Sequence, residues 1–148
     1  MKRTLGHSFR FVELANDVNE HMPDYVATRL MMALNRRRKA VNGSRILLLG
    51  LAYKPNTGDA RESPAASVAE RLVAMGASVR AADPHVMNSH VPAEVTLVEA
   101  STEELAAADA VLVLTDHAAF DYEAVAQHAE YVLDCRRRLP AGETVEHL

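Results

Sequence analysis

Residues 45–72 read RILLLGLAYKPNTGDARESPAASVAERL, and this stretch decides the fold of the 148-residue chain. Its first part, Ile46–Gly50, is continuously apolar, which is typical of a strand covered on both faces. Its last part predicts a helix, because Ser63 suits the N-cap and Pro64 the first helical position. The twelve residues Leu51–Glu62 lie between them, whereas such connections usually have about two to six.

The composition of this loop leaves two interpretations open. Gly50 and Gly58 are eight positions apart, so the loop contains neither G-x-G-x-x-G nor the Gly-Lys-Ser/Thr of a P-loop. In the first interpretation, Lys54 and Arg61 supply positive charge to an anionic ligand through their side chains. In the second, the loop is merely irregular and Arg61 pairs with its neighbours Asp59 or Glu62.

Further aliphatic segments alternate with helical patterns after this stretch. Ser101 and Asp121 suit the N-caps of two of these helices. Strands that alternate with helices predict an α/β fold with a doubly wound parallel sheet, which we assign to residues 41–148. The expected strands after the first are Ser78–Asp83, Val95–Val98, Ala110–Thr115 and Tyr131–Asp134.

Residues 1–40 predict an α-helical segment with a different role. Phe11, Leu14 and Val18 recur at helical spacing, and Pro23 predicts a break followed by a second helix. The basic run 36–39 falls where that helix ends, where cations complement its dipole. The apolar face is too long to be buried by one small domain, so we expect a dimer interface or the remnant of a neighbouring domain.

The overall composition narrows the function classes. A net charge of −4 gives no reason to expect nucleic acid as a partner, and no apolar run is long enough to predict a membrane span. The single cysteine, Cys135, excludes an internal disulfide, which fits a reducing cytoplasm. We interpret Cys135 as a buried thiol. His85, His90 and His117 lack tight ligand spacing, so we expect no metal site.

Ligands of an open α/β sheet bind beyond the carboxyl ends of its strands. The residues expected there are Tyr53, Lys54, Asn56, Thr57, Asp59 and Arg61 after the first strand, Asp83 after the second, Thr115, Asp116 and His117 after the fourth, and Asp134, Cys135 and Arg136 after the fifth.

Several stretches resemble one known family. GLAYKPNTGDARESPA at 50–65 resembles the motif that opens the C-terminal domain of the UDP-glucose/GDP-mannose dehydrogenase family. VNEHMPDYVATRL at 18–30 resembles the segment leading out of that family's central helical domain. Further resemblances follow in order, in VRAADPHV, ADAVLVLTDHAAFDY and YVLDCRRRL.

The resemblance implies a three-part enzyme that oxidises the C6 alcohol of a sugar nucleotide to a carboxylate with NAD. An N-terminal domain holds NAD, a central helical domain carries the catalytic cysteine and mediates dimerisation, and a Rossmann-like C-terminal domain binds the nucleotide. This chain matches only the end of that plan, and Cys135 does not match the cysteine motif. We therefore expect no catalytic residue, no NAD binding and no activity in this chain alone.

Carried over to matching positions, the resemblance assigns UDP-sugar binding to Tyr53, Lys54 and Arg136. Arg61 matches an arginine that reaches toward NAD; without an NAD domain we expect it unpartnered or turned to Glu62. Asp83 and Asp116 are expected to order loops. The sugar stays open between UDP-glucose and UDP-N-acetylmannosamine types. We also expect a homodimer through the N-terminal helices, and a non-catalytic dimerising module is the alternative function.

Overall fold

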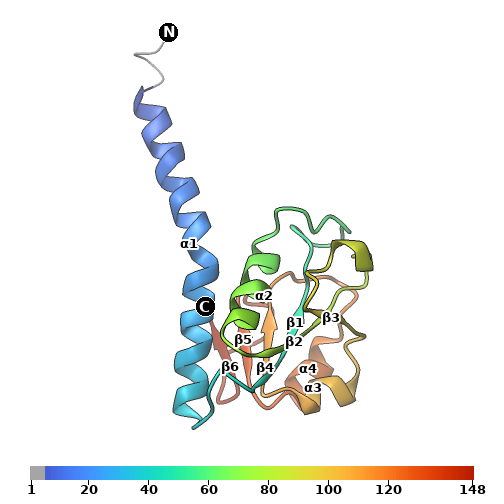
Figure 1. The fold of residues 1–148 in the computed structure, drawn as a ribbon. Coiled ribbons are helices and arrows are strands. Elements are labelled where there is room, and N and C mark those ends of the chain that lie inside the picture. Colours follow the sequence, from blue (N-terminus) through green and yellow to red (C-terminus); the bar gives the residue numbers. More distant parts are fainter. Residues whose placement is uncertain (1–5) are drawn as a thin grey trace.

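The computed structural model describes residues 6–148 as a helix followed by one α/β unit (Figure 1). Helix α1 spans Gly6–Arg36, and the sheet follows from residue 45 onward. The strands are β1 Arg45–Leu49, β2 Ser78–Ala82, β3 Thr96–Leu97, β4 Ala110–Val113, β5 Val132–Asp134 and β6 Val145–His147. The other helices are α2 Pro64–Ala74, the short 3-10 helix η1 Asn88–His90, α3 Thr102–Ala107 and α4 Tyr122–His128.

The six strands form one parallel sheet in the order β3-β2-β1-β4-β5-β6. Strand β1 lies in the middle, where Ile46 pairs with Val79 on one side and Ala110 on the other. The order reverses at β1, so the sheet is doubly wound, and the predicted fold class is confirmed. Strand β6 is not among the predicted strands, because it has only three residues and one buried side chain.

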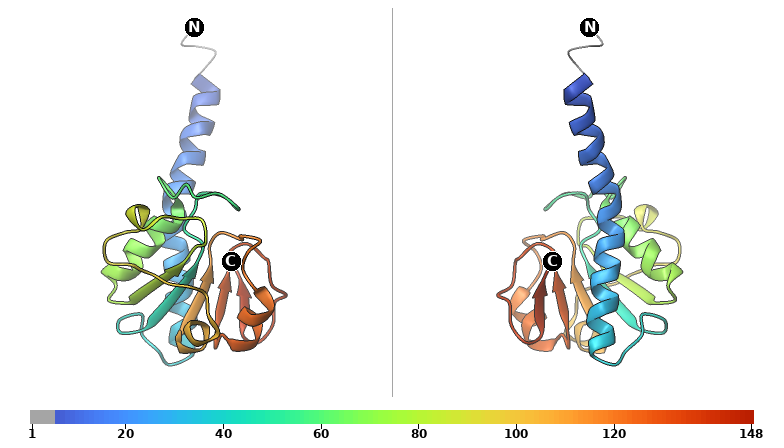
Figure 2. Two further views of the ribbon diagram at one scale, coloured as in Figure 1. Left: turned by 90° about the vertical axis from the view of Figure 1, so that its right-hand side faces the viewer. Right: turned by 90° about the vertical axis from the view of Figure 1, so that its left-hand side faces the viewer.

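Helices cover both faces of the sheet, and the core is divided accordingly (Figure 2). Ile46 and Leu48 belong to the cluster that packs under α1 and α2. Leu47 and Leu49 belong to the cluster under α3 and α4. Because alternate side chains of β1 point to opposite faces and both faces are buried, the strand is apolar throughout, as its sequence predicted.

The predicted helix starts are confirmed. The Ser63 hydroxyl accepts a hydrogen bond from the Ala65 amide, and the Ser101 hydroxyl accepts one from Glu104. Asp121 caps α4 in the same way by accepting from the Ala124 amide. These bonds satisfy amides that the helices themselves leave unpaired, so α2 begins at the point where the long β1–α2 loop ends.

Helix α1 corrects the prediction of two helices, because it continues through Pro23 without a break. The proline cannot donate a backbone hydrogen bond to Asn19, but Asn19 is an exposed residue, so its carbonyl can bond water instead. Pro23 also marks the point at which the helix reaches the α/β unit. Leu30 and Leu34 beyond it are fully buried, and the preceding turns project away from the sheet (Figure 1).

Ion pairs fix the docked half of α1 in place. Arg71 of α2 pairs with Asp24, and Arg36 donates to Glu146 of β6 at 2.6 Å. The Arg37 guanidinium lies 4.4 Å from the centre of the Tyr131 ring. The second half of α1 is therefore an integral layer of the α/β unit. Among the described residues, no helix is long and apolar enough to cross a membrane.

Candidate functional site

The residues predicted to bind ligand lie in loops at one edge of the sheet. Lys54 follows β1 and Arg136 follows β5, and both strands end at the carboxyl edge because all the strands are parallel. Only β4 separates them, so the ends of β1 and β5 are two strand spacings apart, about 10 Å. The topology therefore places the two residues at a common edge.

Asp83, directly after β2, holds the start of the β1–α2 loop. One carboxylate oxygen accepts from the amides of Leu51 at 2.8 Å and Ala52 at 3.0 Å. The other accepts from the amides of His85 and Val86 in its own turn. Burial alone would raise the pKa of Asp83, but these hydrogen bonds, with a further one from His117, lower it below its ordinary value. Asp83 therefore orders loops, as predicted.

His117 after β4 holds the middle of the same loop. Its Nδ1 accepts from the Asn56 amide at 2.9 Å, so the ring carries its hydrogen on Nε2 and donates it to Asp83 at 2.8 Å. The side chain of Asn56 in turn accepts from the Ala118 amide at 3.0 Å. Both nitrogens of this buried ring are engaged, so His117 is no metal ligand. No group of three or more His, Cys, Asp or Glu residues forms a metal site in the described part of the chain.

Two glycines let the loop lie close to neighbouring turns. Gly50 has φ +90°, and a Cβ there would meet Thr115 atoms at 2.5 Å. A Cβ on Gly58 would lie 2.4 Å from the His85 carbonyl oxygen. The Thr115 hydroxyl also donates to the Ala52 carbonyl at 2.7 Å. The loop thus packs into the point where the strand order reverses, which is where a dinucleotide would lie in a sheet with a compact glycine turn.

Tyr53 and Lys54 stand at the surface of this fixed loop. The Tyr53 amide donates to the Asp59 carbonyl at 2.7 Å, while its side chain is 63% exposed. Lys54 is exposed, and within residues 6–148 its ammonium makes no hydrogen bond or ion pair. The Thr57 hydroxyl donates to the Lys54 carbonyl and ties the turn below it. An ordered backbone therefore presents a free cation and an aromatic ring to solvent.

Two of the three consecutive arginines after β5, Arg136 and Arg138, make different contacts. Arg136 donates from Nε to Asp116 at 3.1 Å, and its amide donates to Asp134 at 2.9 Å. Arg138 lies over the Tyr122 ring, 4.9 Å from its centre. Arg136 thus lies beside the β4 loop at the carboxyl edge, still half exposed. Asp116 serves as its partner.

Cys135, between Asp134 and Arg136, is not an activated nucleophile. Burial raises the pKa of its thiol to about 12, and the Asp134 carboxylate adds to the shift. A thiol that stays protonated at neutral pH neither attacks an electrophile nor binds a metal readily. The prediction of a buried thiol is met only in part, because Cys135 is partly buried against the larger core cluster.

Arg61 corrects one expectation. It is neither unpartnered nor turned to Glu62; it pairs with Asp59 through Nε at 3.0 Å and Nη2 at 3.2 Å. This lowers the pKa of Asp59 and raises that of Arg61. The pair lines a groove between the loop and the projecting half of α1, which also includes Asn16, Asn19 and Tyr53. Asp59 was one of the two partners that the irregular-loop interpretation named.

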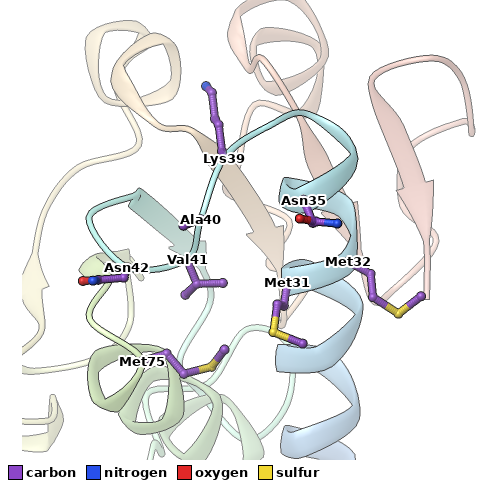
Figure 3. A pocket seen from close by; sticks show the side chains of 8 residues that line it. All are labelled: Met31, Met32, Asn35, Lys39, Ala40, Val41, Asn42 and Met75. Carbon is purple, nitrogen blue, oxygen red and sulfur yellow. The ribbon is translucent and has the colours of Figure 1, made fainter.

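A second cavity lies at the opposite edge of the sheet (Figure 3). Met31 of α1 and Met75, which follows α2, line it beside the segment leading into β1, whereas Met32 points away from Met75. Its lining is mostly apolar, and Lys39 points away from it in Figure 3. None of the predicted ligand-binding residues contributes to this cavity. The carboxyl edge is therefore the stronger candidate for a charged ligand.

A doubly wound parallel sheet with polar loops at its carboxyl edge defines the Rossmann-like class of nucleotide-binding α/β domains. Comparison with known proteins gives the particular family. A model of the UDP-glucose/GDP-mannose dehydrogenase family, UDP binding domain, matches residues 47–141, and the chain belongs to this family.

Individual relatives agree with this assignment. A UDP-glucose 6-dehydrogenase of Haloferax volcanii is 34% identical over 98% of this chain and 34% of its own length. A UDP-N-acetyl-D-mannosamine dehydrogenase of Methanococcus maripaludis is 35% identical over 75% of this chain and 24% of its own. The solved structure of an NDP-N-acetyl-D-galactosaminuronic acid dehydrogenase from Methanosarcina mazei has a TM-score of 0.75 at 27% identity, covering 91% of this chain and 30% of that one. The chain thus spans between about a quarter and a third of these relatives.

Proposed function

We propose that the chain is the UDP-sugar-binding C-terminal portion of an NAD-dependent UDP-sugar 6-dehydrogenase, inactive alone. One observation carries the proposal: Lys54 and Arg136 occupy the same edge of the sheet, and the Lys54 ammonium has no partner within the described residues. A diphosphate bound there would supply the missing counter-charge. We further propose that α1 is the end of the family's central helical domain.

The three proposed ligand contacts differ in chemistry. Lys54 supplies a point charge to the diphosphate from a backbone that is already ordered. Arg136 can offer its fork of N–H groups while Nε stays on Asp116, because its side chain is half exposed. Tyr53 adds an aromatic face beside them. Each charge-assisted contact contributes roughly 1.5–3 kcal/mol when water is excluded.

NAD does not fit this domain. A dinucleotide needs a compact glycine turn after β1, whereas Asn56 and His117 fill the point of strand reversal here and Gly50 already touches Thr115. In the intact enzyme the cofactor belongs to the N-terminal domain. Arg61 is then the residue of this chain that reaches toward it, after exchanging its pair with Asp59 for a cofactor phosphate.

The sugar is proposed only as a choice between two types. Curated relatives at similar identity act on UDP-glucose and on UDP-N-acetyl-D-mannosamine. Most groups that contact the sugar belong, by the family plan, to domains outside this chain. We therefore propose recognition of the UDP moiety as the function of this portion.

The proposal is tested by titrating UDP and GDP into the protein and measuring heat or amide chemical shifts. We expect UDP to bind in preference to GDP, and Lys54→Ala and Arg136→Ala each to weaken UDP binding by about tenfold. Lys39→Ala, at the opposite edge, is the matched control and should leave affinity unchanged. Unchanged amide spectra at millimolar UDP would contradict a preformed site.

A second candidate function is a dimerising module, and the exposed stripe on α1 favours it. Phe11, Leu14 and Val18 share one side of the projecting half and are between about half and three-quarters exposed. Leu30 and Leu34, in contrast, are fully buried within the chain, so charged substitutions there would unfold it. Phe11→Ser with Val18→Ser should convert a dimer to a monomer in light scattering. A parent protein that is already monomeric would contradict this candidate.

A further inference from the structure

Asp83 and His117 form a polar pair with both side chains completely excluded from solvent. Asp83 follows β2 and His117 follows β4, the two strands that flank β1. The ring Nε2 donates to the carboxylate at 2.8 Å. Burying two such groups costs free energy unless their hydrogen-bonding capacity is used, and here the carboxylate accepts five hydrogen bonds while both ring nitrogens are engaged.

Several hydrogen bonds of this pair go to the β1–α2 loop, which follows the strand that β2 and β4 flank. Asp83 accepts from the amides of Leu51 and Ala52, and His117 accepts from that of Asn56. Tyr53 and Lys54 therefore lie between two anchored points of the chain. The fold offers their exposed side chains on a backbone that is fixed on both sides.

We propose that Asp83 and His117 are positioning residues, which hold the Tyr53–Lys54 segment in the conformation that binds the diphosphate. The inference rests on the proposed function, because it concerns the same site. Neither residue touches the ligand. A loop that samples open conformations binds in proportion to the fraction of molecules in the competent one, so the pair raises affinity without contributing a ligand contact.

The tautomer of His117 gives a test that needs neither ligand nor mutation. Nitrogen NMR of the wild-type ring should find Nδ1 without hydrogen and Nε2 with hydrogen, because the Asn56 amide can only donate. A ring with its hydrogen on Nδ1 would overturn the proposed geometry.

Two substitutions of His117 test its hydrogen bonds to Asn56 and to Asp83 separately. His117→Asn places an amide near the position of Nδ1 and keeps an acceptor for Asn56, whereas His117→Gln keeps a donor for Asp83 and loses that acceptor. If the fraction of molecules whose loop is in the binding conformation falls to about one tenth, UDP affinity falls about tenfold. We expect this loss and faster hydrogen exchange of the Asn56 amide in His117→Gln, and a smaller change of exchange in His117→Asn. His128→Gln, in an exposed position of α4, is the matched control and should change neither.

A double-mutant cycle with Lys54→Ala distinguishes positioning from a general loss of structure. If His117 acts through the Lys54 segment, His117→Gln should cost much less affinity once Lys54 is absent. Fully additive losses would overturn the proposal, because they would mean that His117 acts through something other than this segment.

Asn56 provides a milder variant in case the buried substitutions prevent folding. Its φ is +60°, and its side chain ties the loop to the Ala118 amide. Asn56→Gly keeps the backbone conformation but removes this tie, and should weaken UDP binding; Asn56→Asp keeps an acceptor oxygen and should restore it. A wild type that does not bind UDP contradicts the proposed function. A wild type that binds UDP, with unchanged affinity in Asn56→Gly and in any His117 variant that folds, contradicts this inference alone.

Discussion

The lysines at the two edges of the sheet have opposite environments. At the amino edge, Lys39 pairs with Asp109 at 2.8 Å and Glu130 at 2.9 Å, and Glu104 receives both Arg45 and Arg80. At the carboxyl edge, Asp83 and His117 pair beneath the loop, and Arg136 and Arg61 pair with Asp116 and Asp59 at the surface. The Lys54 ammonium has no partner within residues 6–148. Lys39 at the amino edge thus has two carboxylate partners, whereas Lys54 at the carboxyl edge has none within the described residues.

This difference distinguishes a lysine that stabilises the fold from a lysine that can bind a ligand, and it does so without knowledge of the ligand. A cation that already has two carboxylate partners gains little from a third anion, because it must first lose them. A cation on an ordered loop with no partner loses only water. We therefore expect the two edges to respond differently to substitution: the amino edge through stability and the carboxyl surface through binding.

The largest expected effect is on the free energy of unfolding, when the buried carboxylate of Asp83 beneath the carboxyl edge is replaced. Asp83→Asn keeps the shape but removes the charge and brings in an amide N–H that faces other donors. Losing charge-assisted bonds to several amides should lower the free energy of unfolding by about 3 kcal/mol or more. Urea denaturation measures this directly. A loss below about 1 kcal/mol would show that the carboxylate is not the anchor that its contacts indicate.

The same carboxylate predicts how stability depends on pH. The folded state lowers the pKa of Asp83 below 3.8, so its contribution is fully present above that value and is lost as pH falls through the lower, folded pKa. The difference in unfolding free energy between wild type and Asp83→Asn should therefore shrink as the pH falls below about 4. Glu104 and Asp109 have lowered pKa values too, but they are unchanged in the variant and cancel. A difference that stays constant down to pH 2 would contradict this prediction.

The fold was largely predictable because its elements depend on local patterns. The apolar run of β1, the Ser63-Pro64 start of α2 and the Asp121 cap are each readable within a few residues. The break expected at Pro23 was wrong, because the exposed Asn19 carbonyl can exchange its helical bond for water. Strand β6 is too short to give a periodic signal.

The place of Lys54 and Arg136 at one edge was predictable from the sequence, whereas the hydrogen bonds beneath them were not. Parallel strands alone place Lys54 and Arg136 at one edge. The pair of Asp83 and His117 was missed because 34 positions separate the two residues, and only the strand order brings them together. The one available signal was that each directly follows a strand flanking β1.

Substitution of one lysine at each edge compares the two edges, and effects of intermediate size are expected. Lys39→Met should lower the free energy of unfolding by roughly 0.5–1 kcal/mol, since its bridges are partly screened by solvent, and leave UDP affinity unchanged. Lys54→Met should do the reverse, weakening UDP binding about tenfold with little change in stability. Calorimetry with UDP and urea denaturation of both variants provide the four measurements. Equal effects of the two substitutions on binding would remove the distinction between the edges.

The smallest expected effect concerns Arg61, which is paired with Asp59 on the carboxyl side of the sheet. Its exposed pair with Asp59 faces the groove beside α1 rather than Lys54 and Arg136. Arg61→Ala should therefore change UDP affinity by less than about twofold, because the pair lies outside the proposed diphosphate contacts and is screened by water. Calorimetric titration of UDP into Arg61→Ala and into Lys54→Ala measures the difference in affinity between the two variants. A loss as large as that of Lys54→Ala would mean that the groove and the carboxyl edge form one ligand surface, with Arg61 giving up Asp59 to reach the same diphosphate.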